Sequence, residues 1–161
     1  IKPVLTDLQA KDNFLKKVEA ISSEVTATTK KLDEAQKAID KVNSLIKDVK
    51  TDDAKALETA AKDIKKKLDT AREAFTGPKV EGQGIVRNLF PTTMSRLFDP
   101  RSYANSSYTA PGATEERLLT QAKEAAAEAI AKVEAFINGD WKAFEDKVKA
   151  TPIDLFQNIK K

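Results

Sequence analysis

Two rows of apolar residues run along residues 6–49, and they constrain the fold of this chain more than any other sequence feature. The rows alternate at intervals of three and four residues, so they form a single stripe on an α-helix. They consist of Val18, Val25, Leu32, Ile39 and Ile46, and of Phe14, Ile21, Thr28, Ala35, Val42 and Val49. A helix of this length extends for roughly 65 Å. Its stripe needs a partner, so we expect it to pack against other helices.

Two local patterns refine this first helix. Thr6 and Gln9 have the spacing of a capping box, which predicts that the helix starts at Thr6. Residues 25–29 read Val-Thr-Ala-Thr-Thr, and their β-branched side chains crowd the preceding turn of a helix. Because neither Gly nor Pro occurs there, we expect a bend or a local irregularity at these residues, and no chain reversal.

A second helix is predicted from Thr51, where a hydroxyl cap precedes two acids, to the Gly77-Pro78 stop. Its stripe consists of Leu57, Ala61, Ile64, Leu68, Ala71 and Phe75. A third helix is predicted from Thr114, and its stripe consists of Leu119, Ala122, Ala126, Ala129, Val133 and Phe136. The run Asn138-Gly139-Asp140 is expected to break this helix. Trp141, Phe144 and Val148 then indicate a short fourth helix that ends before Pro152.

The fold class that follows is all-α: an antiparallel bundle of three long helices plus a short fourth. A chain of 161 residues with 40% hydrophobic content fits one domain, so we expect residues 1–161 to form a single helical bundle. Two other uses of the stripes stay open, an intermolecular coiled coil and binding to a membrane surface. The polar faces mix acids with lysines throughout, which is not typical of a helix that binds anionic lipid.

Residues 77–113 differ in composition from the rest of the chain. They hold four of the five glycines, four of the six prolines and both tyrosines. Nine of their large apolar residues are Ile85, Val86, Leu89, Phe90, Met94, Leu97, Phe98, Tyr103 and Tyr108. We therefore expect a long ordered loop that packs on the bundle, with one short helix near residues 91–97. The loop either covers the end of the core or forms a surface for a ligand or partner.

Composition excludes several classes of function. The chain has no His and no Cys, so it has no disulfide, no Glu-x-x-His metal motif and no thiol or imidazole chemistry. We expect no cofactor and no metal. The net charge of +3 comes from basic and acidic residues that are mixed along the chain, which is not typical of nucleic-acid binding. No apolar run is long enough for a membrane span, so we expect no membrane insertion.

Catalysis would have to rely on carboxylates. Most acids fall on the polar faces of the predicted helices, and Glu81 and Asp99 are the two acids of residues 77–113. A pair of carboxylates can hydrolyse glycosides, but nothing in the sequence brings these two together. We assign no catalytic, cofactor-binding or metal-binding residue.

The candidate interaction residues are arginines and large aromatic side chains, which are favoured at protein interfaces. They are Arg87, Arg96, Arg101, Tyr103, Tyr108 and Trp141. We expect the arginines to bond to loop carbonyls or to helix carboxylates. For Trp141 the favoured alternative is burial under the central loop.

Several segments resemble one protein family. These are Leu5–Phe14 (LTDLQAKDNF), residues 82–88 (GQGIVRN), residues 95–97 (SRL), Tyr103, residues 106–107, residues 110–112 (APG), residues 138–144 and Phe156. They are similar to the C-terminal helical domain of bacterial secreted proteins that carry sortilin-like (VPS10-type) or BNR-repeat β-propellers and are often labelled glycosyl hydrolases.

The resemblance implies a non-catalytic accessory domain of an exported protein, secreted or held in the periplasm or cell envelope. Its expected partners are the upstream domains of the parent chain. Other proteins are a further class of partner to consider. The first residue is Ile1 rather than Met, which agrees with a domain cut from a larger protein. The alternative is that the domain forms part of a glycan-acting hydrolase, with paired carboxylates in or beside residues 77–113.

Overall fold

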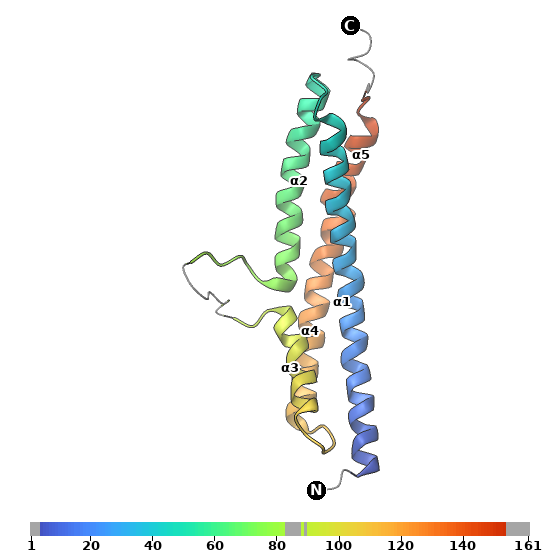
Figure 1. The fold of residues 1–161 in the computed structure, drawn as a ribbon, viewed down its shortest axis with the longest axis vertical. Helices are drawn as coiled ribbons and strands as arrows, with labels where there is room; N and C mark the ends of the chain where they lie inside the picture. Colours follow the sequence, from blue (N-terminus) through green and yellow to red (C-terminus); the bar gives the residue numbers. More distant parts are fainter. Residues whose placement is uncertain (1–3, 83–87, 89, 154–161) are drawn as a thin grey trace. The chain divides into compact units, whose positions relative to one another are not determined.

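The computed structural model describes residues 4–82, 88 and 90–153, and every regular element in that part of the chain is helical (Figure 1). The elements are α1 (Leu5–Ile46), α2 (Asp52–Thr76), α3 (Thr93–Asn105), α4 (Ala113–Phe136), the π-helical turn η1 (Ile137–Trp141) and α5 (Lys142–Ala150). The protein is thus an all-α bundle, as the apolar stripes predict.

The chain divides into two compact units, and α1 and α4 contribute to both. The first unit consists of Ile1–Thr29 and Glu73–Ala131, and the second of Lys30–Arg72 and Lys132–Lys161. In the first unit α3 runs antiparallel to the beginnings of α1 and α4, and in the second α2 runs antiparallel to the rest of α1 (Figure 1). The core of the first unit includes Phe14 and Val18 of α1, Ala104 of α3 and Leu119 of α4.

The predicted stripes form the buried faces of the long helices. In α1 every position of the two rows is buried except Ile21, which is half-buried. Val49, the last position of the predicted stripe, lies beyond the end of α1 and is also half-buried. All six stripe positions of α2 and all six of α4 are buried as well. The cap at Thr51 is also confirmed, because its hydroxyl oxygen accepts a hydrogen bond of 3.2 Å from the backbone N–H of Ala54.

One prediction for α1 is wrong in detail. The helix begins at Leu5, so Thr6 lies inside the first turn. The helix continues through residues 25–29, where no chain reversal was expected. There the hydroxyls of Thr26 and Thr28 donate to the carbonyls of Ser22 and Glu24, at 2.8 and 2.9 Å. Bonds of this kind, to the carbonyl four residues earlier, often accompany a bend in a continuous helix.

The predicted break at residues 138–140 is also wrong. The chain passes from α4 into α5 through η1, a single turn of π-helix. Trp141 closes this turn between two aromatic rings, with ring centroids 6.4 Å from Phe136 and 5.5 Å from Phe144. The turn therefore absorbs Gly139 without ending the helix, and aromatic contacts hold its two sides together.

The central segment contains a longer helix than expected. Thr92 caps α3, and its hydroxyl accepts a hydrogen bond of 3.2 Å from the N–H of Ser95. The helix then continues past the predicted end at Leu97 and through Pro100. A Pro inside a helix removes one hydrogen bond, but Pro100 is fully buried here, and this burial offsets the loss.

The expectation that the large apolar residues of this segment pack down is mostly wrong. Leu97 is buried, but five others are exposed, namely Phe90, Met94, Phe98, Tyr103 and Tyr108. The remaining three, Ile85, Val86 and Leu89, lie outside the described residues. The reason is geometric: α3 buries the one face that carries Thr93, Leu97, Pro100 and Ala104. Apolar side chains on its other faces therefore remain in contact with solvent.

Candidate interaction surfaces

The predicted arginines tie α3 to its neighbours in the first unit. Arg101 forms an ion pair with Glu19 of α1, as predicted for a helix carboxylate. Arg96 instead donates to the side-chain amide oxygen of Gln121 on α4, at 3.2 Å. Arg87 lies outside the described residues. The two described arginines thus hold α3 against α1 and α4, which is a structural role.

The predicted aromatic residues fall into two groups. Tyr103 and Tyr108 belong to the first unit and are 50% and 71% exposed. Trp141 belongs to the second unit and is half-buried beside Phe136 and Phe144. The tyrosines are therefore available to a partner, whereas Trp141 stabilises its own turn.

Tyr103 lies near the end of α3, and Tyr108 lies in the connection between α3 and α4. This connection is at the same end of the first unit as the start of α1 (Figure 1). A hydrogen bond of 3.1 Å from the ammonium of Lys11 to the carbonyl of Ser107 holds α1 beside the connection between α3 and α4. Three more exposed apolar side chains occur here, one just before α1 and two on its first turn. We name this set the terminal surface; it comprises Val4, Leu5, Leu8, Tyr103 and Tyr108.

A second exposed apolar region lies where α2 ends and α3 begins. Gly77 ends α2 with a φ of 74°, which is the left-handed conformation that favours Gly. The hydroxyl of Thr93 donates to the carbonyl of Ala74 at 3.0 Å, and the amide of Asn88 donates to the carbonyl of Thr76 at 3.0 Å. These bonds fix the end of α2 to the start of α3.

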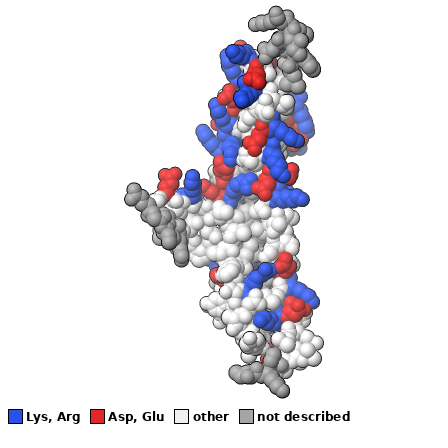
Figure 2. All heavy atoms as spheres, viewed as in Figure 1, with Lys and Arg blue, Asp and Glu red and all other residues white. Residues whose placement is uncertain are grey.

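A cavity of about 410 Å³ lies at this junction. Its lining consists of Glu73, Ala74, Gly77, Pro78, Val80, Asn88, Phe90, Pro91, Thr92 and Thr93. Phe90 is 81% exposed, and Met94 and Phe98 follow it at intervals of four residues. We name the cavity and these three residues the junction surface. Within the first unit, Figure 2 shows white, uncharged atoms over the region where α2 ends and α3 begins.

Sequence reasoning identified the two tyrosines but missed the rest of both surfaces. One signal was present for the terminal surface, because Leu5 and Leu8 lie outside both heptad rows and thus off the buried stripe. A similar signal was the spacing of Phe90, Met94 and Phe98. This spacing does not show whether the three side chains are exposed, because that depends on which face of α3 is buried.

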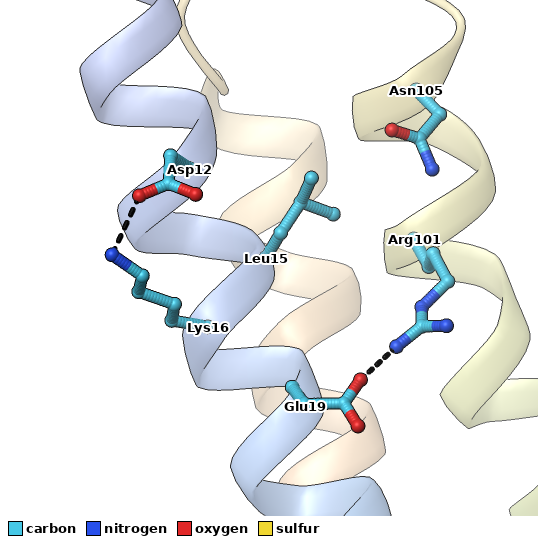
Figure 3. A pocket seen from close by; sticks show the side chains of 6 residues that line it. All are labelled: Asp12, Leu15, Lys16, Glu19, Arg101 and Asn105. Atoms are coloured by element: carbon cyan, nitrogen blue, oxygen red, sulfur yellow. Dashed lines mark hydrogen bonds and ion pairs between the residues drawn. The ribbon is translucent and has the colours of Figure 1, made fainter.

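A third candidate site is a polar groove. A groove of about 330 Å³ between α1 and α3 is lined by Asp12, Leu15, Lys16, Glu19, Arg101 and Asn105 (Figure 3). Its charges are paired, since Lys16 lies 2.7 Å from Asp12 and Arg101 contacts Glu19. The first pair joins two turns of α1, and the second joins α3 to α1.

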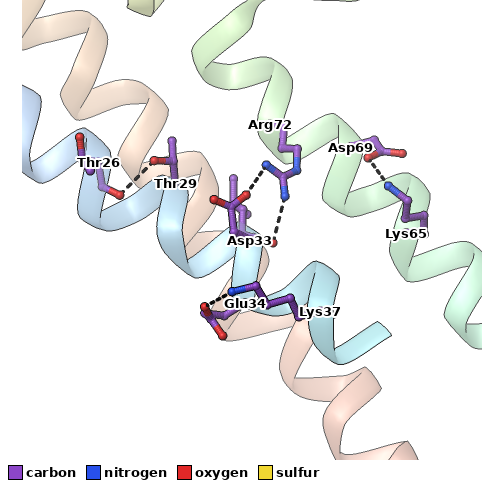
Figure 4. Close-up of polar contacts among 9 residues, drawn as sticks. Thr26, Thr29, Asp33, Glu34, Lys37, Lys65, Asp69 and Arg72 are labelled. Atoms are coloured by element: carbon purple, nitrogen blue, oxygen red, sulfur yellow. Dashed lines mark hydrogen bonds and ion pairs between the residues drawn. The ribbon is translucent and has the colours of Figure 1, made fainter. Parts of the chain in front are cut away.

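In the second unit, Arg72 ties α2 to α1 (Figure 4). Its guanidinium lies 2.8 Å from the carboxylate of Asp33 and donates to the carbonyl of Leu32 at 3.2 Å. Sequence reasoning missed this contact, because Arg72 is one of many charged residues beside the α2 stripe. The guanidinium thus contacts both a side chain and a backbone carbonyl of α1, which is a structural role.

The resolved electrostatic shifts belong to exposed ion pairs on single helices. A hydrogen bond and the charge of Lys37 lower the pKa of Glu34, and Lys62 lowers the pKa of Glu58 in the same way. Conversely, Glu34 raises the pKa of Lys37, and Glu145 raises the pKa of Lys149. All four shifts favour the charged form, as expected for pairs on a solvated helix face.

The two acids of the central segment lie in different elements. Glu81 is exposed in the connection after α2, and Asp99 is half-buried on α3. Over the described ranges 4–82, 88 and 90–153, no group of three or more His, Cys, Asp or Glu side chains could hold a metal ion.

None of the helices in the described part of the chain has the length and hydropathy to cross a membrane. Comparison of the chain with protein-family models, curated proteins and solved structures finds no match.

Proposed function

We propose that this chain is a non-catalytic helical module that contacts another protein through the terminal surface. The observation that carries the proposal is the exposure of five apolar side chains at one end of the first unit, two of them tyrosines. Exposed apolar groups that cluster in this way mark interaction sites, and Tyr is a favoured anchor at interfaces. The paired charges of the α1–α3 groove support a structural role for the acids nearby.

The proposed partner is a domain that precedes this chain in an exported protein that carries a β-propeller. The resemblance described above supports this partner and a location outside the cytoplasm. The terminal surface includes the first turns of α1, so a domain joined to the start of α1 would be held close to it. Such a link raises the effective concentration of the second site to about the millimolar range when the linker is short and flexible.

The test is binding of this chain to the preceding domain, expressed separately, by isothermal titration calorimetry. Tyr108→Ser and Leu5→Ser should each weaken binding by about tenfold or more, as expected when an interface anchor is lost. Phe98→Ser is the matched control. It also replaces an exposed apolar side chain by Ser, but Phe98 does not belong to the terminal surface. Equal affinity for Tyr108→Ser and the unmodified chain would contradict the proposal.

A second measurement addresses catalysis. The isolated chain should show no turnover on a panel of aryl glycosides and oligosaccharides. Turnover that is abolished by Glu81→Gln or by Asp99→Asn would contradict the non-catalytic assignment and would place the active groups in the central segment.

A further inference from the structure

The turn η1 contains the one Asn-Gly pair of the sequence, Asn138-Gly139. The side-chain amide of an Asn can be attacked by the backbone nitrogen of the next residue, and a side chain on that residue obstructs the approach. Gly has no Cβ and therefore obstructs it least. Asn138 and Gly139 are both exposed, and a Cβ built at Gly139 would meet nothing within 4 Å beyond its own stretch of helix. No packed neighbour thus shields the pair.

Helical geometry slows this attack. In a helix the backbone N–H of each residue is bonded to a carbonyl of the preceding turn, and the fixed backbone angles keep its nitrogen from the side-chain carbon of the residue before it. The pair therefore reacts only when the turn opens. None of the five residues of η1 is buried. Segments with few buried groups open locally more often than the core does, so η1 can open while the bundle stays folded.

Few contacts hold the turn closed. Trp141 packs between Phe136 and Phe144, with ring centroids at 6.4 and 5.5 Å. Asp140 also forms an ion pair with Lys67 of α2, but both side chains are about half exposed, and such pairs contribute little. The aromatic contacts of Trp141 are therefore the main restraint on opening.

We propose that Asn138 is a site of spontaneous deamidation, and that local opening of η1 sets its rate in the folded protein. The backbone nitrogen of Gly139 attacks the side-chain carbonyl carbon of Asn138 and loses its proton. The new C–N bond closes a succinimide ring, and the side-chain nitrogen leaves as ammonia with that proton. Water then opens the ring at one or the other carbonyl, which leaves aspartate or isoaspartate at position 138.

The reaction changes the turn in two respects. Either product adds a negative charge to η1, and isoaspartate also lengthens the backbone by a methylene group. The reaction needs only water, and it is independent of the function proposed above, because η1 belongs to neither the terminal surface nor the junction surface.

The first test follows the unmodified chain by peptide mapping and mass spectrometry during storage at mildly alkaline pH. Asn43 is the matched internal control, because it is also exposed and followed by a small residue, Ser44, but lies inside the regular helix α1. Asn138 should convert several-fold faster than Asn43, to a mixture of aspartate and isoaspartate, and Gly139→Ala should slow the conversion. Equal rates at the two asparagines overturn the proposal, and so does a product that contains aspartate alone.

The second test separates local opening from global unfolding. Trp141→Ala should raise the rate at Asn138 by roughly tenfold, because it removes both aromatic contacts. Leu32→Ala is the control: Leu32 is fully buried in the same unit but does not belong to η1, so it should leave the rate unchanged while circular dichroism shows a folded chain. Equal acceleration by both variants, or none by Trp141→Ala, overturns the proposal.

Amide hydrogen exchange of the unmodified chain gives the same answer without a variant. The amides of η1 should exchange faster than the amide of Leu32 in α1, because they open without global unfolding. Equal protection at both places would show that η1 opens only with the whole bundle, and it would also overturn the proposal.

Discussion

Burial separates residues that look alike in the sequence, as two leucines of α1 illustrate. Leu32 is fully buried in the stripe, whereas Leu45 is 48% exposed on the same helix. Leu32→Ala, or Ile39→Ala in the same row, should lower the free energy of unfolding by about 2–5 kcal/mol, because each leaves a cavity in the core. Leu45→Ala should change it by less than about 1 kcal/mol. Urea denaturation measures both, and similar losses for Leu32→Ala and Leu45→Ala would contradict this assignment of the core.

Thr93 offers a second comparison, this time between two hydroxyls. The buried hydroxyl of Thr93 donates to Ala74, whereas the exposed hydroxyl of Thr59 donates to Lys55 within its own helix, at 3.1 Å. Thr93→Val should lower the free energy of unfolding by about 1–3 kcal/mol, because it leaves the partly buried Ala74 carbonyl without this donor. Thr59→Val removes a donor from the exposed Lys55 carbonyl, so it should change the free energy of unfolding very little. Equal urea midpoints for the two variants would show that the Thr93 bond contributes nothing.

At the scale of elements, two glycines with opposite geometry make a matched pair. Gly139 lies in η1 without a positive φ, and an added Cβ would meet nothing within 4 Å. Gly139→Ala should therefore raise the free energy of unfolding by about 0.5–1 kcal/mol, because Ala loses less backbone entropy. Gly77→Ala should lower it by about 1 kcal/mol or more, since φ is 74° and the Cβ would lie 3.0 Å from Thr92. Thermal unfolding with the same sign for both variants would refute this account.

The long helices were predictable from the sequence because their buried faces repeat at a helical period. The period alone was enough to predict the buried faces of α2 and α4, and Gly77 was enough to predict where α2 ends. The exceptions have local physical causes. Pro100 would end an isolated helix, but its burial in α3 offsets the lost hydrogen bond. Gly139 would break an isolated helix, but Trp141 and its aromatic neighbours hold the turn together.

The candidate surfaces were less predictable than the helices. Composition shows that residues 77–113 are rich in aromatic residues, but it does not show which of them face solvent. That depends on which face of α3 is buried, and therefore on how α1 and α4 pack against it. Tyr103 and Tyr108 were predicted as contact residues from residue type, but they were also among the apolar residues expected to pack down, as were Phe90 and Phe98. All four are exposed.

For the whole molecule, the absence of His leads to a prediction about pH. The lowered pKa values of Glu34 and Glu58 give stability that is present above their ordinary value of 4.5 and is lost as pH falls through the lower folded values. The raised pKa values of Lys37 and Lys149 give stability that is present below 10.5 and is lost as pH rises through the higher folded values.

Stability should therefore stay flat between about pH 5 and pH 9 and should fall outside this window, since no side chain of the protein has an ordinary pKa near neutrality. Urea midpoints in buffers across about pH 4–10 test this prediction. A step near pH 6–7 would reveal a strongly shifted carboxyl or amine, and it would reopen the question of catalysis.

The π-helical turn has a consequence for changes in chain length. Phe136 and Phe144 are both buried although eight residues separate them, and a regular α-helix would bring residues back to the same face after seven. The wide turn of η1 accommodates the additional residue. Deleting Gly139 should therefore convert residues 113–150 into one regular helix with Phe136 and Phe144 still in phase. In this sense η1 has the form of a single-residue insertion between α4 and α5.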